Sequence, residues 1–287
     1  MYEFVYPLLA AATFAISSVI MKHLSPYGSA LRLNFFRTSV GAILFLIHAT
    51  VAGILGDLLK LSIWTVIFLV FSVVFNVVLG DSSYFASQEI VGVKIATPIV
   101  NLYPLLTIIL AFIFLEEEVT LKFLGGTVTI ILGVILLSQK EEGEHNERRL
   151  KGFIYAFSSL VLYAAGVLAV TYASTDVDVV VANSIRLPAA AILLFTISHT
   201  PPKRDVKKLD KRFTLTMLFA GLLGTYLSSY YLVLSAQTLG AGKTAVLTSL
   251  GPLFALPLAI FWLKENVTWK IVLGTVISIA GLVLVLI

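Results

Sequence analysis

Two arginines lie inside apolar stretches of this chain, and each stands three residues after an asparagine. The pairs are Asn34 with Arg37 and Asn183 with Arg186. Arginine keeps its charge in proteins, and placing it in an apolar membrane span costs about 2.5 to 3.5 kcal/mol, so such residues usually face a bundle interior or a water-filled cavity. The arginines therefore predict a binding site for an anionic or carboxylate-bearing molecule, with the asparagines on the same helix face as ligands for its polar groups.

Structural roles are the alternative for all four residues. Arg37 stands near the start of its apolar stretch, so its side chain could extend to the membrane surface. Arg186 stands deeper and could instead bind carbonyl groups left open at the end of another helix. Intramembrane asparagine often bonds across to a neighbouring helix, which would make both asparagines packing residues.

Further polar and aromatic side chains are candidates for the same site. The candidates for binding are Tyr84, Tyr103, Tyr163, Tyr230, Gln88 and Gln237. The tyrosines could form an amphipathic cavity wall, although tyrosine is also enriched at both membrane surfaces. Lys94 and Lys243 are expected at the mouths of the cavity, where they would attract an anion or contact lipid headgroups. Asp81 and Glu89 could bind protons, but solvation at the membrane edge is the expectation for both.

These residues are embedded in a sequence that only a lipid environment suits. Hydrophobic residues make up 59% of the 287 residues and charged residues 13%, against about 25% charged in soluble domains. The net charge of +4 therefore indicates membrane orientation and contact with anionic headgroups rather than nucleic acid. The chain contains no cysteine, which excludes disulfides, thiolate metal sites and a cysteine nucleophile.

A bilayer core about 30 Å thick needs about 20 apolar residues for one helical crossing, and the chain offers ten such segments. The expected spans are 3–22, 29–52, 61–86, 91–115, 120–138, 151–173, 177–199, 213–237, 243–263 and 268–287. The fourth and ninth spans contain prolines, which should bend each helix and either free carbonyl groups toward a cavity or serve helix packing alone. These prolines are Pro98, Pro104, Pro252 and Pro257.

The two halves of the chain repeat each other. A shift of 149 residues brings Asn34 and Arg37 onto Asn183 and Arg186, and a shift of 148 aligns the segments after residue 103. Five helices are an odd number, so the second repeat must enter the membrane from the opposite side. We therefore predict an all-α membrane protein with ten transmembrane helices as two inverted five-helix repeats. The repeats are expected at 1–139 and 151–287, joined by a polar linker at 140–150.

The last helix of each repeat carries a matched pair of glycines. Gly126 and Gly133 align with Gly274 and Gly281. Small residues at this spacing let two helices approach closely. Helices five and ten are therefore expected to form a contact surface, within one protomer or between two.

The segment before each glycine helix carries a family resemblance. The segment Leu115-Glu116-Glu117-Glu118-Val119-Thr120 matches Leu263-Lys264-Glu265-Asn266-Val267-Thr268, and each follows a helix with a Pro-Leu pair. This arrangement resembles the drug/metabolite transporter superfamily, specifically its EamA-like ten-helix transporters, over the whole chain. The resemblance implies five plus five inverted helices around a central cavity, with Glu117 and Glu265 as loop-capping or gate residues. Phe14 and Tyr163 occupy the first-helix position where the family often has tryptophan.

Basic residues distribute unevenly between the two membrane faces. The face that holds both termini carries Lys60, Lys122 and Lys243, whereas fifteen of the 20 lysines and arginines lie on the other face. The positive-inside rule makes that second face cytoplasmic. Ten-helix members of the family usually have cytoplasmic termini, so the two indications disagree and the orientation stays open.

The resemblance implies a secondary transporter that moves a small polar metabolite, such as an amino acid or organic anion, by alternating access, with export as the expected direction. The alternatives are a sugar-phosphate or nucleotide-sugar antiporter of the same fold, and a non-transporting membrane scaffold. The sequence lacks hydrolase, zinc-protease and phosphate-loop motifs, so no catalytic residues, metal or cofactor are expected. The expected setting is a multi-pass protein of the cell membrane, monomeric or homodimeric, whose partners are lipid and a small-molecule substrate and not nucleic acid.

Overall fold

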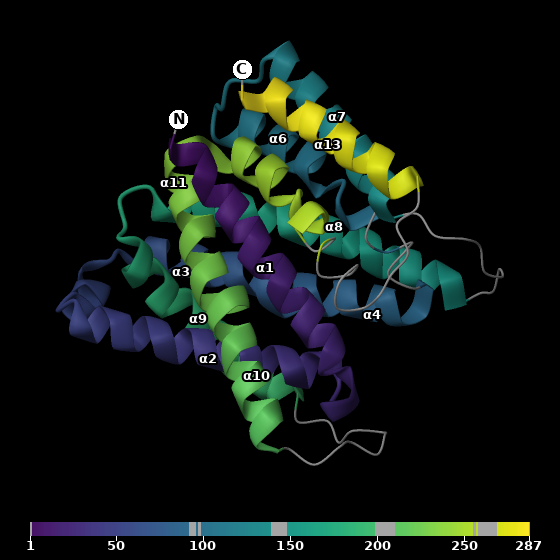
Figure 1. Ribbon diagram of the computed structural model, residues 1–287. Coiled ribbons are helices and arrows are strands. Elements are labelled where there is room, and N and C mark those ends of the chain that lie inside the picture. Colours follow the sequence, from purple (N-terminus) through teal and green to yellow (C-terminus); the bar gives the residue numbers. More distant parts are fainter. Residues whose placement is uncertain are drawn as a thin grey trace.

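The computed structural model describes residues 2–91, 96, 99–138, 148–198, 210–254, 257 and 269–286, and within these ranges the regular elements are all helical (Figure 1). The α-helices are α1 (Val5–His23), α2 (Ala30–Val51), α3 (Ile63–Val73), α4 (Asp81–Val91), α6 (Tyr103–Phe114), α7 (Leu121–Ser138), α8 (Arg148–Ser174), α9 (Val179–Ser198), α10 (Lys211–Gly221), α11 (Ser228–Thr248) and α13 (Trp269–Leu286). Two π-helical segments, η4 (Val74–Gly80) and η5 (Leu222–Leu227), join α3 to α4 and α10 to α11. Short 3-10 turns are η1 (Tyr2–Phe4), η2 (Ser25–Tyr27) and η3 (Leu55–Lys60).

The helices have the length and apolar surface that a bilayer requires. In the described parts of the chain, six stretches are long and apolar enough to cross a membrane: Tyr2–Met21, Leu31–Val51, Ile63–Ser87, Leu150–Ser174, Val179–Ser198 and Lys211–Thr248. Three shorter apolar helices accompany them, at Tyr103–Phe114, Leu121–Leu136 and Val272–Val285. The predicted all-α membrane fold is therefore confirmed. Ten separate spans are not counted, because the ninth expected span, 243–263, lies partly outside the described residues.

The two halves of the structure have helix irregularities at matching positions. The π-helical segments fall in the third helix of each half, at 74–80 and 222–227. Turns interrupt the fourth and ninth spans at 101–102 and 249–250, each just before the Pro-Leu pair of its half. A proline removes one backbone donor and clashes with the preceding turn, so a helix restarts most easily at that point. The predicted proline breaks are therefore present in the described parts of both spans.

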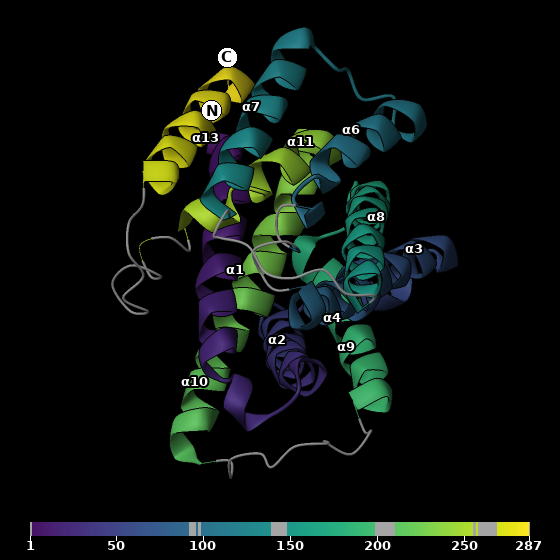
Figure 2. The same ribbon diagram turned by 90° about the vertical axis from the view of Figure 1, so that its right-hand side faces the viewer.

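The two halves exchange their first helices. The helix α1 packs against α11 and η5 of the second half, and α8 packs against α3, η4 and α4 of the first half (Figures 1 and 2). Each exchange is tied by a serine: Ser17 Oγ donates to the Ala220 carbonyl at 2.8 Å, and Ser159 Oγ donates to the Gly80 carbonyl at 3.0 Å. The second helices, α2 and α9, pack against each other, with Phe45, Leu187 and Leu194 in their shared core. This pairing is what two repeats related by an axis in the membrane plane produce.

The fifth helices of the two halves, α7 and α13, lie side by side at the end of the molecule where both chain ends are found (Figure 1). A Cβ atom at Gly133 would lie 2.7 Å from the Gly274 carbonyl oxygen, and one at Gly281 would lie 2.8 Å from the Gly126 carbonyl oxygen. Each glycine thus meets backbone of the opposite helix. The predicted glycine contact surface is confirmed, and it lies within one protomer.

We expect Gly133→Ala to destabilise the protein by about 1–3 kcal/mol, because the added methyl group must push α7 and α13 apart. Gly125→Ala, on the same helix, is the matched control, since no described atom beyond its chain neighbours and its own helix backbone lies within 4 Å of the position that its Cβ would take. The control should leave stability unchanged or raise it slightly, because alanine favours the helix. Thermal unfolding of the purified protein measures both; equal effects at the two positions would contradict the contact surface.

Candidate functional site

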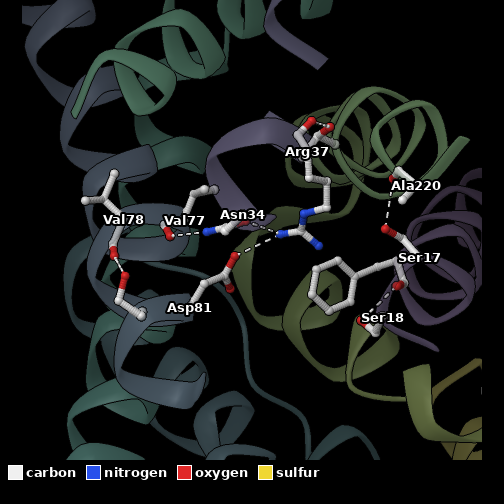
Figure 3. Close-up of polar contacts among 12 residues, drawn as sticks. Ser17, Ser18, Asn34, Arg37, Val77, Val78, Asp81 and Ala220 are labelled. Carbon is white, nitrogen blue, oxygen red and sulfur yellow. Dashed lines mark hydrogen bonds and ion pairs between the residues drawn. The ribbon is translucent and has the colours of Figure 1, made fainter. Parts of the chain in front are cut away.

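Arg37 lies at the centre of a buried polar network in the first half (Figure 3). Its side chain is 2% exposed, so the alternative in which it extends to the membrane surface is wrong. Arg37 Nη2 donates to Asn34 Oδ1 at 2.8 Å and to Asp81 Oδ2 at 3.1 Å. Asn34 Nδ2 in turn donates to the Val77 carbonyl of η4 at 3.3 Å. The asparagine therefore ties α2 to the π-helical segment and orients the arginine, as the packing alternative expected.

Asp81 is not solvated at the membrane edge, and that expectation is wrong. The helix that contains the third span continues as α4 to Val91, so Asp81 lies ten residues inside its end, and the residue is 5% exposed. It is the first residue of α4, directly after η4. Its Oδ2 faces Arg37, while Oδ1 accepts a hydrogen bond of 2.6 Å from Tyr163 Oη of α8. The Asp81 carboxylate thus connects α2 of the first half to α8 of the second half.

The network extends through aromatic residues on both sides of this carboxylate. The Arg37 guanidinium lies over the Phe14 ring of α1 at 5.5 Å. The Tyr163 ring meets the Tyr103 ring of α6 edge-on at 5.9 Å, and Tyr103 Oη lies 2.8 Å from Thr248 Oγ1 of α11. Of the predicted site residues, the structure brings together Asn34, Arg37, Tyr103 and Tyr163. Their contacts link α1, α2, α4, α6, α8 and α11.

Arg186, the counterpart of Arg37, has no carboxylate neighbour among the described side chains. It is 1% exposed, and its Nε donates to Ser72 Oγ at 2.8 Å while Nη1 donates to Asn183 Oδ1 at 2.9 Å. These partners replace the helix-end carbonyls of the structural alternative. Asn183 Nδ2 donates to the Ser229 carbonyl at 3.3 Å, so it repeats the role of Asn34. The shift of 149 residues places Tyr230 where the first half has Asp81.

The other predicted residues make no hydrogen bond to Arg37 or Arg186 among the described residues, or lie outside those residues. Gln237 Nε2 donates to the Ser174 and Val177 carbonyls at 2.6 and 2.7 Å, which caps the end of α8. Tyr230 contacts Tyr231 edge-on and packs into two apolar clusters. Tyr84 is half-buried, one turn after Asp81 on α4. The side chains of Gln88 and Glu89, and all of Lys94, Pro98 and Glu265, lie outside the described residues. Binding roles for these residues stay predictions.

Glu117 caps a helix of the opposite half. Gly240 has a φ of +81°, which breaks α11 between the eighth and ninth expected spans. The chain restarts its helix there, and Glu117 accepts hydrogen bonds from the amides of Ala241 at 2.5 Å and Gly242 at 3.0 Å. A cavity of about 140 Å³ adjoins this cap and is lined in part by Glu118 and Lys243. The predicted capping role is confirmed for Glu117, whereas the role of Lys243 at the mouth of a substrate cavity stays a prediction.

We expect Asp81→Ala to lower the free energy of unfolding by about 3–5 kcal/mol, because it leaves the buried Arg37 without its counter-charge. Replacing both residues, Arg37→Gln with Asp81→Asn, should destabilise the protein less than either single change. Thermal unfolding of the singles and the double gives this coupling. Asp57→Ala is the control at the exposed pair with Lys60, where solvation makes the expected effect small. Additive effects at positions 37 and 81 would contradict the pairing.

We expect Glu117→Ala to destabilise the contact between the halves, because it removes two hydrogen bonds to a carboxylate, worth about 1.5–3 kcal/mol each. Amide hydrogen exchange should rise at residues 241 and 242. Glu118→Ala is the matched control, since Glu118 is exposed and makes no hydrogen bond among the described residues. If those amides exchange as slowly in Glu117→Ala as in the wild type, the carboxylate is not the cap.

Comparison with known proteins gives a consistent result along the whole chain. The model of the EamA-like transporter family matches twice, at residues 2–139 and 150–287. An uncharacterized transporter of Archaeoglobus fulgidus is 26% identical over 100% of this chain and 98% of its own length. A second uncharacterized transporter of that organism is 25% identical over 47% of this chain and 48% of its own. A solved structure, described only as the crystal structure of a protein, shares the fold with a TM-score of 0.78 at 14% identity, over 98% of this chain and 94% of that one.

Proposed function

Because the chain belongs to the EamA-like transporter family and is therefore a multi-pass membrane transporter, we propose that it carries a small polar metabolite with a carboxylate group, such as an amino acid or organic anion. The single observation that carries this proposal is Arg186, a buried cation with no carboxylate among its described neighbours. The proposed setting is the cell membrane, and the proposed direction is export.

The electrostatics of Arg186 support an anionic substrate. Removing a charge from water costs several kcal/mol unless an opposite charge lies close by. Arg37 has such a partner in Asp81, whereas Arg186 has, among the described residues, only the neutral groups of Ser72 and Asn183. No described residue accepts a hydrogen bond from Arg186 Nη2. A guanidinium binds a carboxylate best through two parallel hydrogen bonds, so this nitrogen is available for a substrate. A substrate carboxylate would supply the missing charge.

The same charges favour a carboxylate over a phosphate. The buried charged side chains of the described residues are Arg37, Asp81 and Arg186, which sum to one positive charge. A carboxylate neutralises that charge, whereas a phosphate monoester would leave an excess of negative charge in a low-dielectric region. With Asp81 ionised, a sugar-phosphate or nucleotide-sugar antiporter would therefore need further cations.

The arrangement of the halves supports alternating access. The polar contacts Tyr163 to Asp81, Tyr103 to Thr248 and Glu117 to Ala241 each join one half to the other. Inverted repeats can exchange such contacts between two equivalent conformations, which opens a site between them to either side. The glycine surface of α7 and α13 is filled within one chain, which supports a monomer as the transporting unit.

We expect Arg186→Met to abolish transport of the carboxylate substrate while leaving the protein folded. Its loss of stability should be far smaller than that of Arg37→Met, because Arg186→Met removes an uncompensated charge whereas Arg37→Met strands Asp81. The measurement is uptake of labelled amino acids and carboxylic acids, including L-alanine, L-glutamate, lactate and succinate, into reconstituted proteoliposomes. Thermal unfolding of the same samples reports folding.

Arg212→Gln is the control for this experiment, since Arg212 is exposed at the start of α10. It should transport like the wild type. Transport by Arg186→Met at the wild-type rate would remove Arg186 from the substrate site. Unfolding of Arg186→Met to the same extent as Arg37→Met would instead assign Arg186 a structural role. Transport of sugar phosphates, and of none of the carboxylates, would replace the proposed substrate class.

A further inference from the structure

We propose that Asp81 is a proton-binding site of this transporter, and that the proton bound there moves together with the anionic substrate. The inference rests on the proposed function for its substrate, but the proton site itself can be tested without one. In the proposed function Arg186 binds the substrate anion, and the carboxylate of Asp81 has no role. Proton binding gives that carboxylate a role in transport.

Asp81 is placed where protonation changes the contact between the two halves. Both of its oxygens are occupied, one by Arg37 of the first half and one by Tyr163 of the second. A proton on the carboxylate removes the ion pair with Arg37 and turns one oxygen from acceptor into donor. The groups that face Asp81 are Arg37 from α2 and Tyr163 from α8, with Tyr84 one turn along α4, and η4 holds no titratable residue.

The second half shows that the fold does not require this carboxylate. Arg186 is held by Asn183 and a serine hydroxyl, with Tyr230 at the position that matches Asp81. An Asn-x-x-Arg pair in this setting is therefore positioned by neutral partners. The carboxylate of the first half is an addition to that scaffold, and among the described residues the second half has no carboxylate at the matching position.

Arg37 retains unused binding capacity. Its Nε is buried and has no hydrogen-bond partner among the described residues, and its guanidinium lies over the Phe14 ring. When Asp81 is neutral, its carbonyl oxygen can still accept a hydrogen bond from this group, as Asn34 Oδ1 does, but the counter-charge of the guanidinium is gone. The guanidinium then presents most of its donors and a full positive charge. Such a group attracts an anion in the same low-dielectric region.

Charge makes proton and substrate bind together. With Asp81 ionised, the buried charges sum to one positive charge; with a proton on Asp81 they sum to two. A substrate carboxylate is repelled by the ionised Asp81 and is bound more tightly when the proton is present. Thermodynamic linkage makes the effect reciprocal, so the bound anion also strengthens proton binding. Proton and anion therefore travel in the same direction, and an anion that accumulates in the cell leaves with its proton.

Infrared difference spectroscopy of the purified protein tests the proton site without any substrate. Lowering the pH should produce a C=O band of a buried carboxylic acid in the wild type, and the band should be absent in Asp81→Asn. Tyr163→Phe should shift the band, because it removes the hydrogen bond to Oδ1. Asp57→Asn, at an exposed loop carboxylate, is the control and should keep it. Identical spectra for the wild type and Asp81→Asn throughout the pH range would overturn the proposal.

Coupling is tested by adding L-alanine, L-glutamate, lactate and succinate to weakly buffered protein with a pH indicator. Binding should take up one proton per anion in the wild type and none in the neutral double variant Arg37→Gln with Asp81→Asn. The double variant avoids a stranded charge, so it keeps the test valid if Asp81→Asn fails to fold. Anion binding without proton uptake in the wild type would overturn the coupling. Binding of none of these anions, with the infrared band present, would overturn the proposed substrate and leave the proton site standing.

Discussion

A guanidinium that cannot reach water must find its partners inside the protein, and this constraint organises the centre of the molecule. Arg37 and Arg186 both lie deep in a bundle whose outer surface is apolar. Each is held by the asparagine one turn before it, and each asparagine is fixed by a carbonyl of the third helix of its half. Those carbonyls belong to, or directly follow, the π-helical segments. In a π turn, backbone carbonyl groups are displaced from the regular helical hydrogen-bond pattern. Such a carbonyl can accept a hydrogen bond from an asparagine side chain inside the membrane.

Much of this arrangement could be predicted from the sequence because its physical causes are local. Span lengths follow from bilayer thickness, and most of the described helices begin and end within a few residues of the expected limits, whereas α6 begins only at Tyr103, inside the expected span 91–115. The aligned Asn-x-x-Arg pairs and glycines indicated the repeat. Its inversion followed because a repeat of five helices, an odd number, makes the second repeat enter the membrane from the opposite side. The glycines of α7 and α13 also identified a close contact, because backbone contact between helices requires a missing side chain.

The partners of the arginines could not be predicted, because they depend on which helices of opposite halves meet. Asp81 was expected at the membrane edge, since the predicted third span ended at residue 86, whereas α4 continues to Val91. A usable signal existed: Asp81 is the only acidic residue between 58 and 88, and a nearby carboxylate stabilises a buried arginine. Ser72 gave no signal, because serine is common in membrane helices and its role depends on packing between α3 and α9.

The interfaces between the halves are of two physical kinds, and the difference bears on how the molecule could move. The contact of α7 with α13 is glycine against backbone, where a small displacement loses dispersion contacts that nothing else replaces. The contacts of α8 with α4, and of α6 with α11, carry hydroxyl and carboxylate groups that can exchange one partner for another, including water or substrate. Alternating access needs both kinds, since a rigid contact keeps the halves in register while exchangeable contacts open. The bundle therefore concentrates its titratable and anion-binding groups in the interfaces whose bonds can be replaced, and leaves the glycine contact uncharged.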